Sequence, residues 1–231
     1  MKAFAFCAAS LVAAAAANAD IVYMYHGSGL AVEAEFTLLD PTTLEIRLCN
    51  ISTAVPGDFD NSDQILTGIS WDFGLPGMDP GDVTIVGGSV LIGGSSHAMN
   101  FDTGAYGPGD DVSGEYGYSN IGTTGMLPNM LTGNESHATP FGGLNLDGSD
   151  GLNGPQGGMV ADPLLVDLGG LGAIHNEIIA TLYLSAPLSS LDFLYDTGVI
   201  AEFGSDAKFI PAPGSALLLG LSALAARRRR G

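Results

Sequence analysis

The stretch LAVEAEFTLLDPTTLEIRLCN, residues 30–50, decides the fold class. Apolar side chains occupy every second position from Val32 to Leu38 and again from Leu44 to Leu48, with mostly polar residues between them. A period of two is typical of a β-strand that buries one face. The link at 40–43, Asp-Pro-Thr-Thr, has the residues of a tight turn. The sequence therefore predicts an antiparallel hairpin here.

Outward from this hairpin, short apolar runs alternate with Gly and Pro along the chain. The other candidate strands are Ile21–Tyr25, Gln64–Phe73, Asp82–Val86, Ser89–Ile92, Tyr116–Ile121, Met159–Val166, Glu177–Ser185, Leu191–Tyr195 and Thr197–Phe203. Gly87 and Gly88 predict a hairpin turn between two of these strands. The apolar run Glu177–Ser185 predicts a nearly buried central strand. We expect an all-β fold, namely an antiparallel β-sandwich or jelly-roll-like domain.

One domain with long glycine-rich loops accounts for the middle of the chain. Residues 95–158 are rich in Gly, Asn, Asp and Ser, and Gly makes up 34 of 231 residues, roughly twice its usual share of about 7%. No repeat of fixed period is present, so a solenoid or propeller is not predicted. We therefore assign residues 20–209 to a single extracellular β-domain.

The charge of this domain excludes one class of partner. Between Asp20 and Ile210 the chain has 25 acidic residues and only two basic ones, Arg47 and Lys208, for a net charge of −23. A surface this acidic repels phosphate backbones, so we expect no nucleic-acid partner.

The N-terminus has the pattern of a secretory signal. Lys2 precedes an apolar run, Ala3–Ala17, in which Ser10 is the one polar residue. Ala17 and Ala19 flank Asn18 in the small-x-small pattern of a cleavage site. We expect residues 1–19 to form a signal helix that directs export and is removed after Ala19.

The C-terminus combines three features in a fixed order. Residues 211–214 read Pro-Ala-Pro-Gly, where the two prolines hold the backbone extended. Ser215–Ala226 is an apolar run of twelve residues, and Arg227–Arg230 follow it. Twelve helical residues span about 18 Å, which suits a thinned membrane with snorkelling arginines. The four arginines resist translocation and predict a cytoplasmic stop.

This C-terminal arrangement resembles the PEP-CTERM sorting signal of exported bacterial proteins, in a Pro-Ala-Pro variant. On that resemblance the motif is Pro211, Ala212, Pro213 and Gly214, and the cytoplasmic stop is Arg227, Arg228, Arg229 and Arg230, within a signal at 210–231. Ala212 stands where the family has Glu. The resemblance implies a short transmembrane helix, processing by an exosortase, transient inner-membrane anchoring and final release to the cell surface or outside. It also implies an association with exopolysaccharide and biofilm.

A search for catalytic chemistry gives no positive signal. Cys49 is the single cysteine of the predicted mature part, so no internal disulfide is expected. None of the four histidines has zinc-ligand spacing, and the chain has neither a nucleophile elbow nor a phosphate-binding loop. We therefore predict no enzymatic activity, no catalytic residue and no organic cofactor.

Calcium is the one metal that the sequence suggests. Asp58, Asp60 and Asp63 place carboxylates on one short loop, and Asp147 and Asp150 lie on a glycine-rich turn. Calcium prefers six to eight oxygen ligands, which such loops can supply. Neither loop has the spacing of a helix-loop-helix site, and Asp, Asn and Gly are also common in solvated turns.

Aromatic residues suggest a sugar-binding surface as a further alternative. Tyr106, Tyr116 and Tyr118 lie among glycines and could be exposed, whereas Trp71 falls in a strand pattern and is expected in the core.

Three interpretations follow. The first is a non-enzymatic surface or extracellular-matrix protein that the export machinery and an exosortase handle. The second is a glycan- or calcium-binding module on the same scaffold, and the third is a secreted hydrolase.

Overall fold

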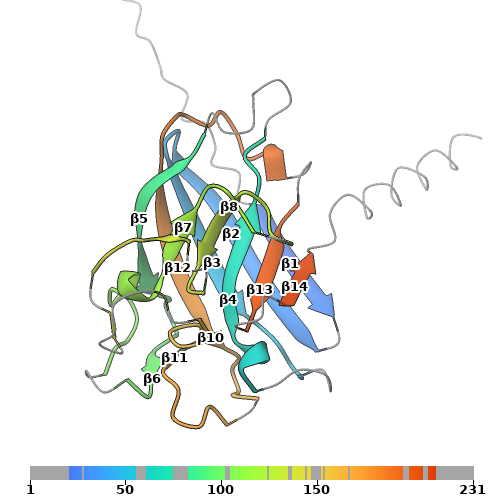
Figure 1. The fold of residues 1–231 in the computed structure, drawn as a ribbon, viewed down its shortest axis with the longest axis vertical. Helices are drawn as coiled ribbons and strands as arrows, with labels where there is room; N and C mark the ends of the chain where they lie inside the picture. The colour runs from blue at the N-terminus through green and yellow to red at the C-terminus, as the bar shows by residue number, and fades with distance from the viewer. Residues whose placement is uncertain are drawn as a thin grey trace, which may run out of the picture.

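The fold is all-β, as the sequence predicts. The structure is a computed structural model that describes residues 21–27, 29–55, 61–74, 83–101, 105–123, 125–134, 137–143, 145–146, 152, 154–165, 167–194, 198–204 and 208–211. Within these residues the chain forms two β-sheets and two short 3-10 turns, η1 (Asn61–Gln64) and η2 (Ser113–Glu115) (Figure 1).

The first sheet contains five antiparallel strands in the order β1-β2-β3-β12-β5. Their bounds are β1 Ile21–Gly27, β2 Leu30–Asp40, β3 Thr43–Asn50, β12 Glu177–Leu184 and β5 Ile85–Ile92. The predicted hairpin is confirmed, because β2 pairs with β3 through the turn at Asp40. There the Asp40 carboxylate accepts hydrogen bonds from the backbone N–H and the hydroxyl of Thr42, and these bonds lower the pKa of Asp40.

The second sheet has nine shorter strands. Its main path is β6-β11-β10-β4-β8-β7-β9, and β13 joins β4 and carries β14. The bounds are β4 Leu66–Trp71, β6 Ala98–Met99, β7 Gly117–Ser119, β8 Asn129–Thr132, β9 Thr139–Pro140, β10 Met159–Val160, β11 Ala173–His175, β13 Ile200–Phe203 and β14 Lys208–Pro211. Pairing is antiparallel except between β10 and β11.

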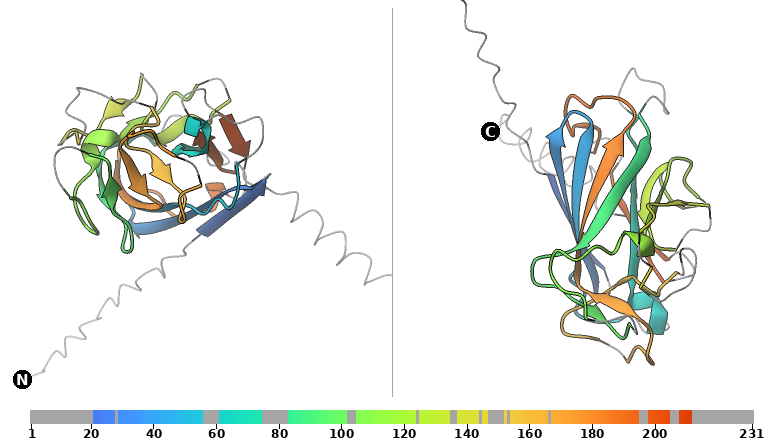
Figure 2. Two further views of the ribbon diagram at one scale, coloured as in Figure 1. Left: turned by 90° about the horizontal axis from the view of Figure 1, so that it is seen from below. Right: turned by 90° about the vertical axis from the view of Figure 1, so that its left-hand side faces the viewer.

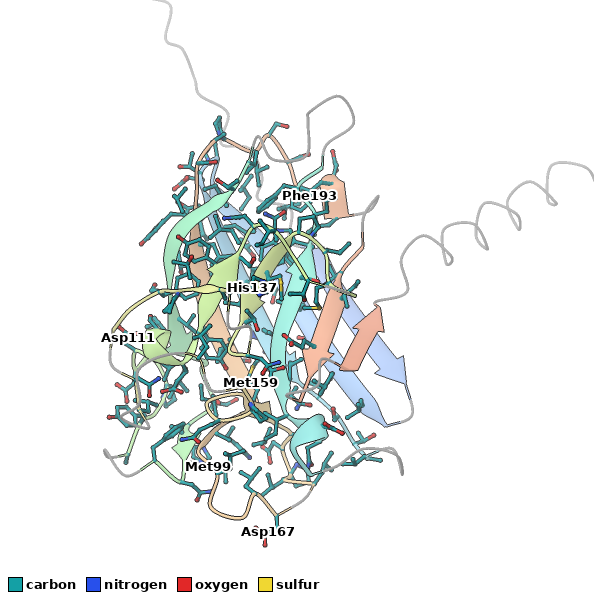
Figure 3. All side chains as sticks on the ribbon, viewed as in Figure 1. Met99, Asp111, His137, Met159, Asp167 and Phe193 are labelled. Carbon is teal, nitrogen blue, oxygen red and sulfur yellow. The ribbon has the colours of Figure 1, made fainter. Side chains whose placement is uncertain are left out.

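The two sheets lie face to face and share one hydrophobic core (Figure 2). Phe36 of β2 meets Trp71 of β4 edge to face, with ring centroids 5.7 Å apart, and the predicted burial of Trp71 is confirmed. Asn50 links the layers with hydrogen bonds, since its amide donates to the carbonyls of Gln64 and Met159. Side chains fill the space between the sheets, from Phe193 near the top of Figure 3 to Met159 in its lower half.

Two local predictions are wrong, and a third is confirmed in part. Gly87 and Gly88 lie inside the continuous strand β5, which pairs with β12, and they form no hairpin turn. Residues 191–194 form no strand: a bend and a turn at Leu191 and Asp192 lead into helical residues 193 and 194, and the Leu194 N–H donates to the Leu191 carbonyl. Strand β12 is central, as predicted, and its residues are buried or half-buried except Tyr183, which is 51% exposed.

The predicted loop region at 95–158 contributes to the fold more than its composition suggests. It contains β6, β7, β8 and β9. Met130, Leu131 and Tyr116 from this region are fully buried, and the Tyr116 hydroxyl donates to the Gly157 carbonyl. The expectation that Tyr116 could be exposed is therefore wrong.

The first and last described strands are neighbours. β1 and β14 contact each other, and each lies at an edge of its own sheet. The predicted signal helix at 1–19 and the apolar run 215–226 lie outside the described residues. Within the described part of the chain, no helix is long and apolar enough to cross a membrane.

Candidate functional site

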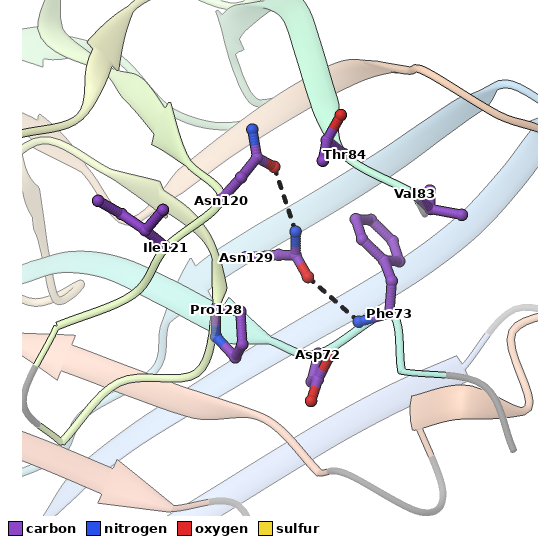
Figure 4. Close-up of a pocket in the computed structure, with 8 residues that line it drawn as sticks. All are labelled: Asp72, Phe73, Val83, Thr84, Asn120, Ile121, Pro128 and Asn129. Atoms are coloured by element: carbon purple, nitrogen blue, oxygen red, sulfur yellow. Dashed lines mark hydrogen bonds between the residues drawn. The ribbon is translucent and has the colours of Figure 1, made fainter. Parts of the chain in front are cut away.

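A pocket of about 260 Å³ opens where four strands of the two sheets end or begin. Its walls come from the residues that follow β4, precede β5, follow β7 and begin β8. The residues that line it are Asp72, Phe73, Val83, Thr84, Asn120, Ile121, Pro128 and Asn129 (Figure 4). Asp72 and Phe73 thus meet Asn120 and Asn129 at one site, although more than 40 positions separate them in the sequence.

Two asparagine amides hold these segments together. The Ile85 N–H donates to Asn120 Oδ1 at 2.7 Å, and Asn120 Nδ2 donates to the Ile85 carbonyl at 2.9 Å. Asn129 Nδ2 donates to Asn120 Oδ1 at 3.2 Å, and the Phe73 N–H donates to Asn129 Oδ1 at 3.1 Å (Figure 4). These partners fix which end of each amide is oxygen. An amide nitrogen carries two hydrogens. Asn120 Nδ2 and Asn129 Nδ2 each use one of them in the hydrogen bonds above, so a second N–H remains on each amide.

The pocket is lined by buried apolar side chains and by one exposed apolar side chain. Phe73 is buried and packs between the rings of Trp71 and Phe193, at centroid distances of 5.8 and 5.2 Å. Ile121 is 78% exposed, which is unusual for a large apolar side chain. Asp72 accepts a hydrogen bond from the Gly74 N–H at 2.8 Å, which orients its carboxylate.

The described lining residues offer groups that can bind a polar ligand. Among them, Asp72 is the single carboxylate and none is His, Cys, Lys or Arg. Glycoside hydrolysis usually uses a pair of carboxylates on opposite sides of the bond. The pocket instead offers amide N–H groups, a carboxylate and apolar surface, which can hold a ligand with hydroxyl groups.

A charged cluster occupies the outer face of the first sheet. Arg47 of β3 donates to Glu177 of β12 at 2.8 Å and to Glu33 of β2 at 3.0 Å, and Glu35 lies 3.6 Å away. Burial acts to raise the pKa of Glu177, but hydrogen bonds from Arg47, Cys49 and the Gly94 N–H outweigh it and lower that pKa. The cluster crosslinks three adjacent strands.

Cys49 is buried beside this cluster and is a poor nucleophile. Its thiol donates to Glu177 Oε2 at 3.3 Å. Burial, together with the hydrogen bond to Glu177, raises the pKa of Cys49 to about 12. A catalytic thiol requires surroundings that favour the thiolate, and these favour the thiol.

Two further polar groupings lie outside the pocket. Glu202 of β13 is fully buried and accepts hydrogen bonds from Thr132 Oγ1 at 3.1 Å and Asn134 Nδ2 at 2.8 Å. His97 and His175 stack with ring centroids 4.7 Å apart, and His175 Nε2 lies 3.5 Å from Asp162. The structure brings these residues together although they lack any motif in the sequence.

Most of the predicted calcium ligands fall outside the described residues. Asp58, Asp60, Asp147 and Asp150 are not described, and Asp63 is buried in η1. Among the residues that are described, no group of three or more His, Cys, Asp or Glu side chains could hold a metal ion. The calcium site at the predicted residues stays a prediction.

The predicted sorting residues are described in one position only. Pro211 is the last residue of β14, whereas Ala212–Gly214, Arg227–Arg230, Ala17 and Ala19 lie outside the described residues.

Of the tyrosines considered for sugar binding, Tyr106 and Tyr118 are half-buried and pack against the core. None of the three tyrosines lines the pocket.

Comparisons with known proteins found no match: no family model, no curated protein and no solved structure matches this chain.

Proposed function

We propose that this is an exported surface or extracellular-matrix protein without enzymatic activity, which an exosortase processes at its C-terminal signal. In this proposal residues 1–19 are a signal helix, 20–209 an extracellular β-sandwich of jelly-roll-like type, and 210–231 a sorting signal with a short transmembrane helix. The mature protein reaches the cell surface or its surroundings and associates with exopolysaccharide.

One observation carries the proposal. Strand β1 begins at Ile21, two residues after the predicted cleavage site at Ala19. Strand β14 ends at Pro211, the first residue of the predicted sorting motif. Cleavage after Ala19 and beyond Pro211 would therefore leave every described strand in place. A body that keeps its sheets after both cuts is what an exported and processed protein requires.

The net charge and the single cysteine of the β-domain are also consistent with a protein that works outside the cell. The span from Asp20 to Ile210 has a net charge of −23, which favours solubility and keeps single molecules apart. The single cysteine of this span is held as a thiol, so its fold depends on the core rather than on a disulfide.

The arginine tail provides a direct test. We expect deletion of Arg227–Arg230 to remove the cytoplasmic stop, so that the chain leaves the cell with its C-terminus uncut. The matched control replaces the four arginines by lysines, which keep the charge and should keep the processing. Identical processing of the deletion variant and the natural chain would contradict the proposal.

A glycan-binding module is the second candidate function, and the pocket favours it. Amide, carboxylate and apolar groups converge there from segments distant in the sequence. This function is compatible with the first, because a matrix protein can hold a polysaccharide. Calcium binding and secreted hydrolysis are the further alternatives, and neither has a described set of residues in its favour.

A further inference from the structure

We propose that the pocket between β4, β5, β7 and β8 binds one neutral sugar ring of a polysaccharide. The inference deepens the proposed function and rests on it for the source of the ligand, since it names the site and the sugar class behind the association with exopolysaccharide. The pocket itself belongs to the folded body and can be tested whatever the fate of the C-terminal signal.

The size of the pocket sets the first limit on its ligand. Its volume of about 260 Å³ equals that of roughly nine water molecules at ~30 Å³ each. Pockets for drug-sized ligands and cofactors begin at about 300 Å³. A single pyranose ring with its hydroxyl groups fits this space, whereas a dinucleotide or a haem does not.

The polar groups match hydroxyl chemistry. Each sugar hydroxyl both donates and accepts a hydrogen bond. Asn120 and Asn129 each have one amide N–H beyond the hydrogen bonds described above, and these can donate to sugar oxygens. The Asp72 carboxylate can accept from a hydroxyl, and hydrogen bonds to a charged group are the stronger ones.

These groups are held in place before any ligand arrives. The Ile85 and Phe73 backbones fix the two amides, and the Gly74 N–H orients Asp72. Asn129 is only 4% exposed, so a ligand that reaches its amide displaces little bulk water. Preorganised groups of this kind reduce the loss of conformational entropy on binding.

The apolar lining matches the other side of a sugar ring. A pyranose presents C–H groups on its faces, and these pack on apolar surface. Phe73 and Val83 are buried in the walls, and Pro128 and Ile121 line the pocket beside the amides (Figure 4). Ile121 is 78% exposed, and contact with a ligand would cover part of its apolar surface.

Charge decides between sugar classes. Among the described residues that line the pocket there is no basic side chain to neutralise a carboxylate or phosphate, whereas Asp72 is acidic. The acidic body repels polyanions as well. Uronate polymers and nucleotide sugars are therefore excluded, and neutral sugars are favoured.

The test is calorimetric titration of the full-length chain in detergent. The probes are the neutral tetrasaccharides cellotetraose and maltotetraose, with tetraguluronate as an anionic counterpart. We expect saturable binding of at least one neutral probe, with a Kd near ~1 mM, as suits a single sugar ring. We expect no heat from tetraguluronate.

Two variants locate the binding site. Asp72→Asn keeps the shape and the acceptor for the Gly74 N–H but removes the charge, and Ile121→Ala removes the exposed apolar side chain. Each should weaken neutral binding by about tenfold, in the range for one lost charged hydrogen bond or one lost apolar contact. Val86→Ala is the matched control, because Val86 is an exposed apolar residue outside the lining.

Three outcomes would overturn the proposal. They are no saturable binding of a neutral probe at concentrations up to about ten times that Kd, equal binding of tetraguluronate, and an affinity that neither Asp72→Asn nor Ile121→Ala lowers relative to Val86→Ala. A chain that binds the neutral probe but is never exported or cut would contradict the proposed function and leave the pocket proposal standing. A chain that is exported and cut but binds neither neutral probe would contradict the pocket proposal and leave the proposed function standing.

Discussion

Arg47 is one of two basic residues between Asp20 and Ile210, where the chain has 25 acidic residues. Its position among three glutamates explains how it stabilises the first sheet. Without it, Glu33, Glu35 and Glu177 would face one another across three adjacent strands. Like charges on neighbouring strands destabilise a sheet. The guanidinium instead joins them, with Glu177 as the most buried partner.

This contact predicts a pH dependence at Glu177. The pKa of Glu177 is lowered by folding, so its stabilisation is present above the unfolded pKa near 4.5 and is lost as pH falls through the folded pKa. We expect Glu177→Gln to reduce the free energy of unfolding by about 2 kcal/mol at pH 7. The difference from the natural chain should shrink below about pH 4.5 in urea unfolding.

Glu35→Gln is the control for this measurement. Glu35 lies 3.6 Å from Arg47, and both side chains are about a third exposed, so we expect a loss below about 0.5 kcal/mol. A Glu177→Gln effect of the same size at every pH would show that the carboxylate charge is not what stabilises the sheet.

Cys49 should resist thiol reagents in the folded protein. Its pKa near 12 leaves almost no thiolate at pH 8, and the side chain is buried. We expect iodoacetamide to label Cys49 only as fast as the body unfolds, as read by peptide mass mapping. A cysteine placed at exposed Ser95 provides the internal standard. Comparable labelling rates for Cys49 and Ser95→Cys under native conditions would refute the contact with Glu177.

At the scale of elements, strand β5 contains two adjacent glycines with opposite roles. A Cβ on Gly88 would lie 2.4 Å from the Thr181 carbonyl oxygen and 2.9 Å from the Phe141 ring. A Cβ on Gly87 would meet nothing closer than 3.8 Å, at Tyr183. Gly88 is thus required by close packing, whereas Gly87 is not.

The pair gives a matched test of β5. We expect Gly88→Ala to destabilise the body by about 2 kcal/mol, the typical effect of overpacking. Gly87→Ala should be neutral or stabilise by ~0.5 kcal/mol, because alanine narrows the unfolded ensemble. Denaturant unfolding of both variants measures the difference. Large, equal losses would instead point to a glycine turn at 87–88.

The elements also show what the sequence can predict. The hairpin at 30–50 is local: its alternation and its turn lie in one stretch, and β2 and β3 pair as expected. The sequence misleads at Gly87 and Gly88 because glycine is common both in turns and where backbones approach closely. It misleads at Tyr116 because neighbouring glycines suggest exposure, whereas the side chain is fully buried.

The pocket could not be predicted for a different reason. Asp72, Asn120 and Asn129 have no motif among them, and only the pairing of β4, β7 and β8 brings them together. The one sequence signal is that each stands where an alternating strand pattern stops or begins. Such positions are numerous, so the signal does not select these three.

At the scale of the whole molecule, the two described sheets form one body between Ile21 and Pro211. The core lies between the sheets, and the edge strands β1 and β14 contact each other beside it. The described strands begin at Ile21 and end at Pro211, so the predicted signal helix and nearly all of the predicted sorting signal lie outside them. Removal of both segments should leave the stability of the body unchanged.

The intact mass of the protein collected from outside the cells tests the proposed function most directly. We expect a chain that begins at Asp20 and has lost the residues after about Pro213, in agreement with cleavage at both predicted signals. A full-length chain ending at Gly231, recovered in soluble form from inside the cell, would contradict export, anchoring and processing together.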